Sequence, residues 1–131
     1  MREAFYGTRR FEDFLSHIDV STGVLAARLR ELVEEGILEK RPYQEPGARV
    51  RDEYHLTDKG RSMLPVLVAL IDWADRWLGE PAGPTVILRH RDCGAPVTAA
   101  VVCAEGHRVA GPRDVLATPG PGAQPTPGRP D

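Results

Sequence analysis

The residues with the clearest chemical potential are arginines and hydroxyl-bearing residues in the first half of the chain. Arg49 and Arg51 follow a Pro-Gly turn, and Arg28 lies in a leucine-rich stretch. A guanidinium group is permanently charged and binds phosphate oxygens through several N–H donors. Ser21 and Thr22 open a helical pattern, where free backbone N–H groups also bind phosphate. This combination predicts contacts with a phosphate backbone.

Two cysteine–histidine pairs lie in the last third of the chain, as His90-x2-Cys93 and Cys103-x3-His107. Zinc prefers a tetrahedral set of sulfur and nitrogen ligands, and the spacing inside each pair suits it. The four residues could therefore hold one zinc ion. The alternative is a ribbon that has lost its metal and keeps two free thiols. No other cofactor is predicted.

Composition excludes several function classes. No Ser-His-Asp set, paired catalytic carboxylates, P-loop or dinucleotide fingerprint is visible, so we do not expect an enzyme. No apolar run approaches the roughly 20 residues that span a bilayer, and we expect a cytoplasmic protein with no membrane partner. The net charge of −2 gives no bulk attraction to nucleic acid, so the arginines would have to gather on one face.

Apolar periodicity predicts the helices that hold these side chains. Residues 11–18 place apolar side chains at i, i+3, i+4 and i+7, which is typical of an amphipathic helix. Leucines at 25, 29 and 32 predict a second helix, capped by Ser21 and ended by Gly36 in a left-handed conformation. Residues 1–7 are typical of the last turn of a helix, and residues 8–10 of a short edge strand.

The segment after Gly36 predicts a β-hairpin and then a long helix. Residues 37–43 and 50–56 suit strands, and residues 44–48 supply turn chemistry between them. Thr57 caps the long helix, in which Pro65 is expected to kink or delimit the first turn. The apolar arc of this helix is wide enough for two partners, the domain's own core and another subunit. The predicted dimer-interface residues are Leu70, Trp73 and Trp77, and simple core filling is the alternative for the tryptophans.

The stretches at Leu25–Leu38 and from Tyr54 onward carry the most specific motifs, L-x-x-R-L-x-x-L-x-x-x-G-I-L and Y-x-L-T-x-x-G-R. Through them, residues 2–78 resemble the HxlR-type winged helix-turn-helix transcriptional regulators. The resemblance implies a homodimer that places residues 21–35 in the major groove of DNA. It also implies a wing at 43–50 near the backbone or minor groove. The long helix at 57–78 would help to form the dimer, together with the N-terminal helix.

The chain departs from this family at two places. Most of the first helix is missing, and small residues at 23, 26 and 27 stand where long polar side chains would read bases. Thr22 and Ala26 could still touch thymine methyl groups. Arg28 could instead pair with Glu31 or Glu12, and the two wing arginines with Glu53 or Glu39. The predicted DNA-contacting residues are Ser21, Thr22, Ala26, Arg28, Arg49, Arg51, Arg9 and Arg10.

We therefore predict an α+β, mainly helical chain in three parts. Residues 1–80 form a winged helix-turn-helix domain with a C-terminal dimerisation helix, residues 81–116 a small β-hairpin extension, and residues 117–131 a disordered tail. The predicted function is a regulator that binds pseudo-palindromic duplex DNA as a homodimer. The alternative is a dimerisation or protein-interaction module that has lost DNA binding. The sequence identifies no small-molecule effector.

Overall fold

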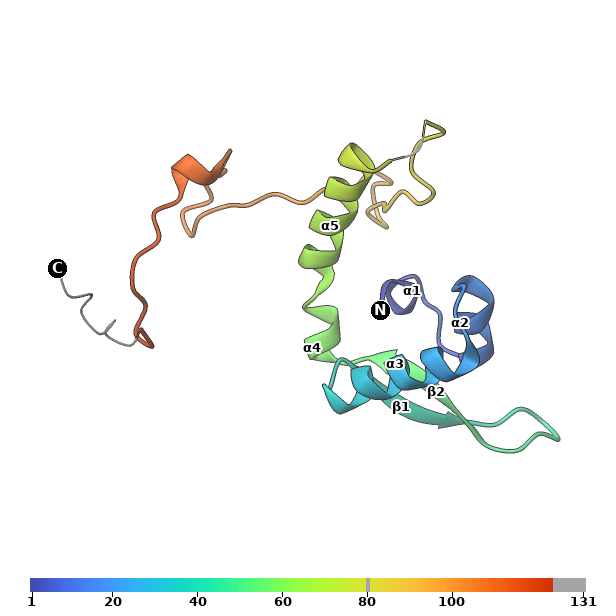
Figure 1. The fold of residues 1–131 in the computed structure, drawn as a ribbon. Coiled ribbons are helices and arrows are strands. Elements are labelled where there is room, and N and C mark those ends of the chain that lie inside the picture. The colour runs from blue at the N-terminus through green and yellow to red at the C-terminus, as the bar shows by residue number, and fades with distance from the viewer. Residues whose placement is uncertain (80, 124–131) are drawn as a thin grey trace. The chain divides into compact units, whose positions relative to one another are not determined.

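The computed structural model describes residues 1–79 and 81–123, and its internal contacts divide the chain into two units at Ala99 and Ala100 (Figure 1). The architecture is α+β and mainly helical. In chain order the elements are α1 (Arg2–Phe5), α2 (Phe11–His17), α3 (Thr22–Glu34), β1 (Leu38–Tyr43), β2 (Arg51–Leu56), α4 (Asp58–Arg61), α5 (Leu64–Trp77) and a short 3-10 turn η1 (Pro112–Asp114).

A small apolar core joins the first three helices to the hairpin. Phe14 of α2 lies at its centre and meets the ring of Tyr54 edge-on, with ring centroids 6.3 Å apart. Such an edge-to-face pair adds roughly 0.5–1.5 kcal/mol beyond the area that it buries. The buried members of this core are Ala4, Phe14, Leu25, Leu29, Leu38 and Leu56. The apolar spacing predicted from the sequence therefore points the expected leucines inward.

Both predicted ends of α3 are confirmed. The hydroxyl of Ser21 accepts a hydrogen bond from the backbone N–H of Val24 at 3.3 Å, as an N-cap should. At the other end Gly36 has a φ of 67°, and the N–H of Ile37 donates to the carbonyl of Leu32 at 2.9 Å. This is the Schellman arrangement, which satisfies the last carbonyls of the helix. The helix is thus fixed at both ends by its own sequence.

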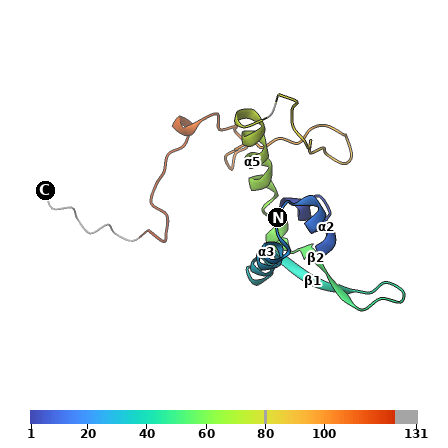
Figure 2. The ribbon, with the colours of Figure 1, turned by 45° about the vertical axis from the view of Figure 1, so that its right-hand side comes forward.

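The predicted hairpin is also confirmed, with β1 and β2 antiparallel and Leu38 opposite Leu56. Residues 44–50 form its tip, which we call the wing tip. Inside it, the side-chain amide of Gln44 donates to the carbonyl of Ala48 at 2.9 Å. In Figures 1 and 2 the wing tip projects beyond α2 and α3. The ribbon is therefore anchored at its base and exposed at its end.

The helix predicted after Thr57 is divided near Pro65, where a kink or the limit of the first turn is expected, and the structure has two helices there. Thr57 caps α4, accepting from the N–H of Gly60 at 3.0 Å and donating to the carbonyl of Gly36 at 2.6 Å. The chain then leaves the helical path at residues 62–63 and resumes as α5, with Pro65 in its first turn. Proline has no N–H, and its ring would clash with the carbonyl of Arg61 in a continuous helix.

Helix α5 keeps a wide apolar surface. Val68 is buried, and Leu67, Ile71 and Ala74 are half-buried and face α1 across a shallow hollow. The exposed fractions of Leu70, Trp73 and Trp77 are 59%, 54% and 68%. The expected edge strand at residues 8–10 is wrong. The carbonyl of Arg9 accepts one hydrogen bond from the N–H of Tyr54 in β2, at 2.8 Å. Among the described residues, no further backbone hydrogen bond extends this contact into a strand pairing.

The pairing after residue 81 differs from the single hairpin that the sequence predicts. In the first unit, residues 88–97 close a short turn in which Arg89 pairs with Pro96. In the second unit, residues 101–109 close another, in which Val102 pairs with Arg108. Each segment therefore folds back on itself. Of the predicted tail 117–131, residues 124–131 lie outside the described residues. Within residues 1–79 and 81–123 no helix has the length and apolar character needed to cross a bilayer.

Candidate nucleic-acid interface

Helix α3 is buried on one face only. Leu25 and Leu29 pack into the core, and the opposite surface carries no covering element. The exposed side chains of α3 and its N-cap are Ser21, Thr22, Val24, Arg28, Arg30, Glu31 and Glu34. Gly23 is exposed with them, while Ala26 and Ala27 are half-buried. A three-residue loop at 35–37 leads directly from this helix to the base of the ribbon.

The N-terminal half of the exposed surface is small and uncharged, and it contains free backbone donors. The first intrahelical bond runs from the N–H of Leu25 to the carbonyl of Ser21, at 3.0 Å. The amides of Thr22 and Gly23 precede that bond and therefore point out of the helix end. Together with the helix dipole, such amides attract an anion such as a phosphate.

Several predicted DNA-contacting arginines form ion pairs inside the domain. Arg28 pairs with Glu31 at 2.8 Å, which is one of the alternatives that the sequence left open. Arg51 pairs with Glu12 of α2 at 2.7 Å, and neither Glu53 nor Glu39 is its partner. Both pairs are exposed, and exposed pairs contribute only about 0–1 kcal/mol. Either guanidinium can therefore exchange its carboxylate for a phosphate at little cost.

Arg9 and Arg10 are bound more firmly. Arg9 donates to the carbonyl of Ala4 at 2.8 Å and so closes the end of α1. Arg10 pairs with Glu45 at 2.7 Å and with Glu53 at 3.3 Å, and its guanidinium lies 4.5 Å from the ring centre of Tyr43. These contacts give both residues a structural task, at α1 for Arg9 and between α2 and the wing for Arg10.

Hydrogen bonding raises the pKa of two arginines of this domain and lowers the pKa of one carboxyl group. Hydrogen bonds to Glu53 and Glu45 raise the pKa of Arg10 above its already high ordinary value. The hydrogen bond to Glu31 does the same for the pKa of Arg28. The pKa of Glu53 is lowered, chiefly by its hydrogen bond to His55 and then by Arg10. Arg10, Arg28 and Glu53 therefore stay charged near neutral pH.

Two arginines on α3 and the wing are free of ion pairs with any residue in the described part of the chain, namely Arg30 and Arg49. Arg49 is exposed at the wing tip and lines a polar hollow of about 430 Å³ with Arg51. Arg30 lies on the exposed surface of α3 but is absent from the set predicted from the sequence. Its position on the helix, one turn after Ala27 and opposite the buried Leu25, is the sequence feature that predicts its exposure.

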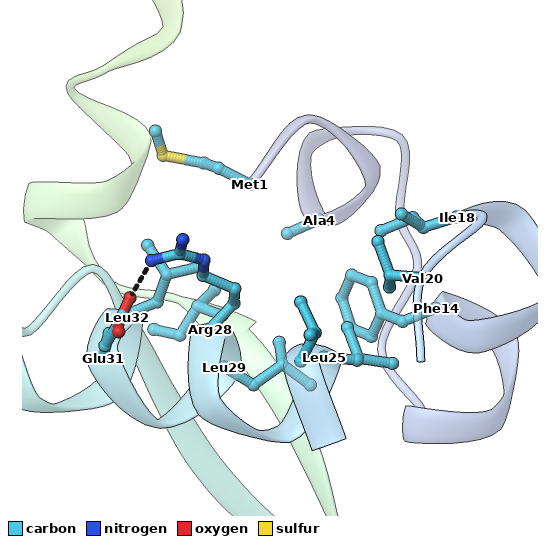
Figure 3. A pocket seen from close by; sticks show the side chains of 12 residues that line it. Met1, Ala4, Phe14, Ile18, Val20, Leu25, Arg28, Leu29, Glu31 and Leu32 are labelled. Atoms are coloured by element: carbon cyan, nitrogen blue, oxygen red, sulfur yellow. Dashed lines mark hydrogen bonds and ion pairs between the residues drawn. The ribbon is translucent and has the colours of Figure 1, made fainter. Parts of the chain in front are cut away.

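An apolar cavity of about 330 Å³ borders the other side of α3 (Figure 3). It is lined mainly by residues of α3 such as Val24, with Ala4 of α1, Phe14 of α2 and the flanking Met1 and Ile18. The guanidinium of Arg28 lies at this cavity, where it pairs with Glu31. Arg28 therefore points toward the α1 side of α3, away from the surface that carries Arg30.

A helix exposed along one face, packed against a second helix and followed by an arginine-edged ribbon, defines a DNA-binding winged helix-turn-helix protein. The comparisons agree with this class. The family model described as HxlR-like helix-turn-helix matches residues 1–82, and the chain belongs to that family. It is a DNA-binding transcriptional regulator and not an enzyme, as predicted.

Relatives share most of the chain. The uncharacterised HTH-type transcriptional regulator Rv3095 of Mycobacterium tuberculosis (strain H37Rv) is 37% identical over 122 residues, which cover 93% of this chain and 76% of the relative. Among solved structures, PA1607, a candidate transcription factor, has 37% sequence identity to this chain and a TM-score of 0.77. The match covers 89% of this chain and 80% of PA1607. PA1374 from Pseudomonas aeruginosa is 34% identical with a TM-score of 0.66, over 94% and 82%.

Proposed function

We propose that this regulator binds pseudo-palindromic duplex DNA as a homodimer. Each protomer inserts α3 into a major groove and lays its wing tip on the neighbouring sugar–phosphate backbone. The observation that carries this proposal is the one-sided burial of α3. An exposed face is common to amphipathic helices, but on α3 this face combines the free amides of Thr22 and Gly23 with Arg30, which has no ion pair among the described residues.

Affinity comes chiefly from phosphate contacts. The amides of Thr22 and Gly23 and the guanidinium of Arg49, which has no ion-pair partner within residues 1–79 and 81–123, are the best placed donors. Arg30 adds a further cation on α3. Such contacts release counterions and make binding strongly dependent on salt, but they carry no direct sequence information. Because Gly23, Ala26 and Ala27 are small, few side chains reach base edges, and part of the specificity rests on DNA shape.

Dimerisation through α5 would place two such units on one duplex. Leu70, Trp73 and Trp77 form the exposed apolar side of this helix. Tryptophan is enriched at the centre of protein interfaces, and a contiguous apolar surface of this kind is rare on a monomer. With a two-fold axis, the preferred sites are inverted repeats whose half-sites lie roughly one helical turn, about 10 bp, apart.

The test is fluorescence anisotropy of a labelled duplex from the protein's own upstream region, measured over a range of salt concentrations. We expect Arg49→Ala to weaken binding to all duplexes and to reduce the salt slope by about one unit. The matched control is Arg41→Ala, on the same ribbon but already paired with Glu39, and its salt slope should change less. An Arg49→Ala salt slope equal to that of the unmodified protein would refute the wing contact.

Half-site spacing tests the homodimer separately. Inserting about 5 bp between the half-sites of a bound duplex turns one half-site to the opposite face of the helix, and inserting about 10 bp restores the face. We expect affinity to fall with the first insertion and to recover in part with the second. Equal affinity for all three duplexes would mean that a single protomer binds.

A further inference from the structure

The two short turns near the C-terminal end each bring one cysteine and one histidine together. In the turn at residues 88–97, Sγ of Cys93 lies 3.3 Å from Nδ1 of His90. In the turn at residues 101–109, Sγ of Cys103 lies 3.6 Å from Nδ1 of His107. These are the chain's only cysteines and two of its four histidines. Each cysteine therefore has a histidine as its neighbour, in two separate pieces of chain.

The backbone of each turn holds its pair in place. In the first turn the N–H of Gly94 donates to the carbonyl of His90 at 2.8 Å, and in the second the N–H of Gly106 donates to the carbonyl of Cys103 at 2.9 Å. Gly94 and Gly106 have φ values of 70° and 81°. This left-handed conformation costs a side-chain-bearing residue about 1–2 kcal/mol, and it reverses the chain so that the two side chains converge.

The sulfur–nitrogen distances match the bite of a tetrahedral metal ion. Zinc lies about 2.3 Å from a thiolate sulfur and about 2.0–2.1 Å from an imidazole nitrogen, so at the tetrahedral angle the two ligand atoms are about 3.5 Å apart. The observed separations of 3.3 Å and 3.6 Å fall on either side of that value. All four side chains are exposed, so an ion in solution can reach them.

We propose that each turn is a two-ligand half-site for a thiophilic divalent cation, with zinc as the natural occupant. His90 and Cys93 would form one half-site, and Cys103 and His107 the other. Among the described residues no group of three or more Cys, His, Asp or Glu side chains gathers in one place, so each turn supplies a pair. The ion would bind the thiolate forms, and one proton per cysteine would pass to the solvent.

This inference is independent of DNA binding, because both turns follow residue 82, where the family match ends. The competing explanation is a thiol–imidazole hydrogen bond in each turn, with no metal. Metal binding would replace the thiol proton with the ion and form a sulfur–metal bond that spectroscopy detects. The proposal therefore concerns a second binding property of the chain, with its own readout.

The experiment uses the full chain, stripped of metal under reducing conditions and titrated with zinc against a chromophoric chelator. Cobalt replaces zinc in a parallel titration, in which the near-ultraviolet sulfur-to-metal band reports thiolate ligation. We expect Cys93→Ser to weaken zinc binding at the first turn, and Cys103→Ser at the second, by at least about 100-fold each, since even outer-shell partners contribute 10–100-fold. The double variant should show no sulfur-to-cobalt band.

The matched controls are Asp92→Asn and Glu105→Gln, which change one acidic residue inside each turn and keep the cysteine–histidine pair. They should bind zinc as the unmodified protein does. Far-ultraviolet circular dichroism and duplex binding show that each variant is folded. Absence of zinc binding in the unmodified chain, or equal binding in the double cysteine variant, would overturn the proposal and leave hydrogen bonds only.

Discussion

Arg10 and Glu45 join the start of α2 to the wing tip, with Nη1 of Arg10 donating to Oε1 of Glu45 at 2.7 Å across 35 residues of sequence. The same guanidinium lies over the ring of Tyr43 and pairs with Glu53. One side chain therefore contacts both strands of the ribbon and its tip. We infer that Arg10 sets the direction of the wing and does not serve primarily as a phosphate ligand.

The Arg10–Glu45 pair makes a prediction that separates these two roles. If Arg10 braces the wing, Arg10→Ala and Glu45→Gln should have similar effects. Both should speed hydrogen exchange of the backbone amides at residues 44–50, and both should weaken duplex binding. If Arg10 instead holds phosphate, Glu45→Gln should free it and tighten binding. Amide exchange by mass spectrometry, together with anisotropy, therefore distinguishes a brace from a ligand.

The pairing of Glu53 predicts a dependence of stability on acid. Hydrogen bonds from His55 and Arg10 lower the pKa of Glu53 in the folded state. A carboxyl whose folded pKa is depressed contributes stability above its unfolded pKa of about 4.3, and this contribution is lost as pH falls through the folded pKa. We expect the melting temperature to drop below about pH 4.3, and we expect Glu53→Gln to show a shallower drop. Parallel curves for the two proteins would contradict this.

Much of the fold could be predicted from the sequence because its signals are local. Ser21 can cap a helix, Gly36 can end one, and leucines three and four residues apart need a common face. The division between α4 and α5 was also signalled, since Pro65 cannot donate a backbone hydrogen bond. Its consequence was underestimated, because the apolar pattern continues past Pro65 and conceals the break in the helix.

The site was harder to predict, because partners far apart in sequence decide what an arginine does. Arg51 meets Glu12 and Arg10 meets Glu45 only once the ribbon folds back onto α2. Sequence spacing could identify Glu31 as a partner for Arg28, since the two are three residues apart on one helix. Arg30 is absent from the predicted set because exposure alone does not separate a DNA-contacting arginine from a solvated one.

Gly60 lies in the middle of the short helix α4, where a side chain has no room. A β-carbon at this position would clash with the carbonyl oxygen of Ile37 and lie 3.0 Å from Cδ2 of Leu56. Because the obstacle is backbone, it cannot move aside cheaply. We expect Gly60→Ala to lower the free energy of unfolding by about 1–3 kcal/mol, measured by urea denaturation.

Gly23 is the matched control for Gly60, since it also lies in a helix but a β-carbon there would meet no atom within 4 Å outside its own helix. We expect Gly23→Ala to raise the free energy of unfolding by about 0.5–1 kcal/mol, because alanine suits a helix better. Duplex binding of the same variant tests how closely α3 approaches DNA. A stabilised variant that binds more weakly places a duplex against this position, and unchanged binding places it farther away.

The two tryptophans give a direct test of the proposed dimer. Trp73 and Trp77 are the chain's only tryptophans, and both are exposed on α5. If α5 forms the interface, their emission should lie at short wavelength in concentrated samples and move to longer wavelength on dilution, as the dimer dissociates.

Trp77→Ala should weaken dimerisation by about 2 kcal/mol, a typical loss for a buried interface tryptophan. Sedimentation velocity measures the same equilibrium, and Leu116→Ala, at an 86% exposed residue outside α5, is the control. Emission that stays constant on dilution, with a monomer at all concentrations, would exclude α5 as the interface.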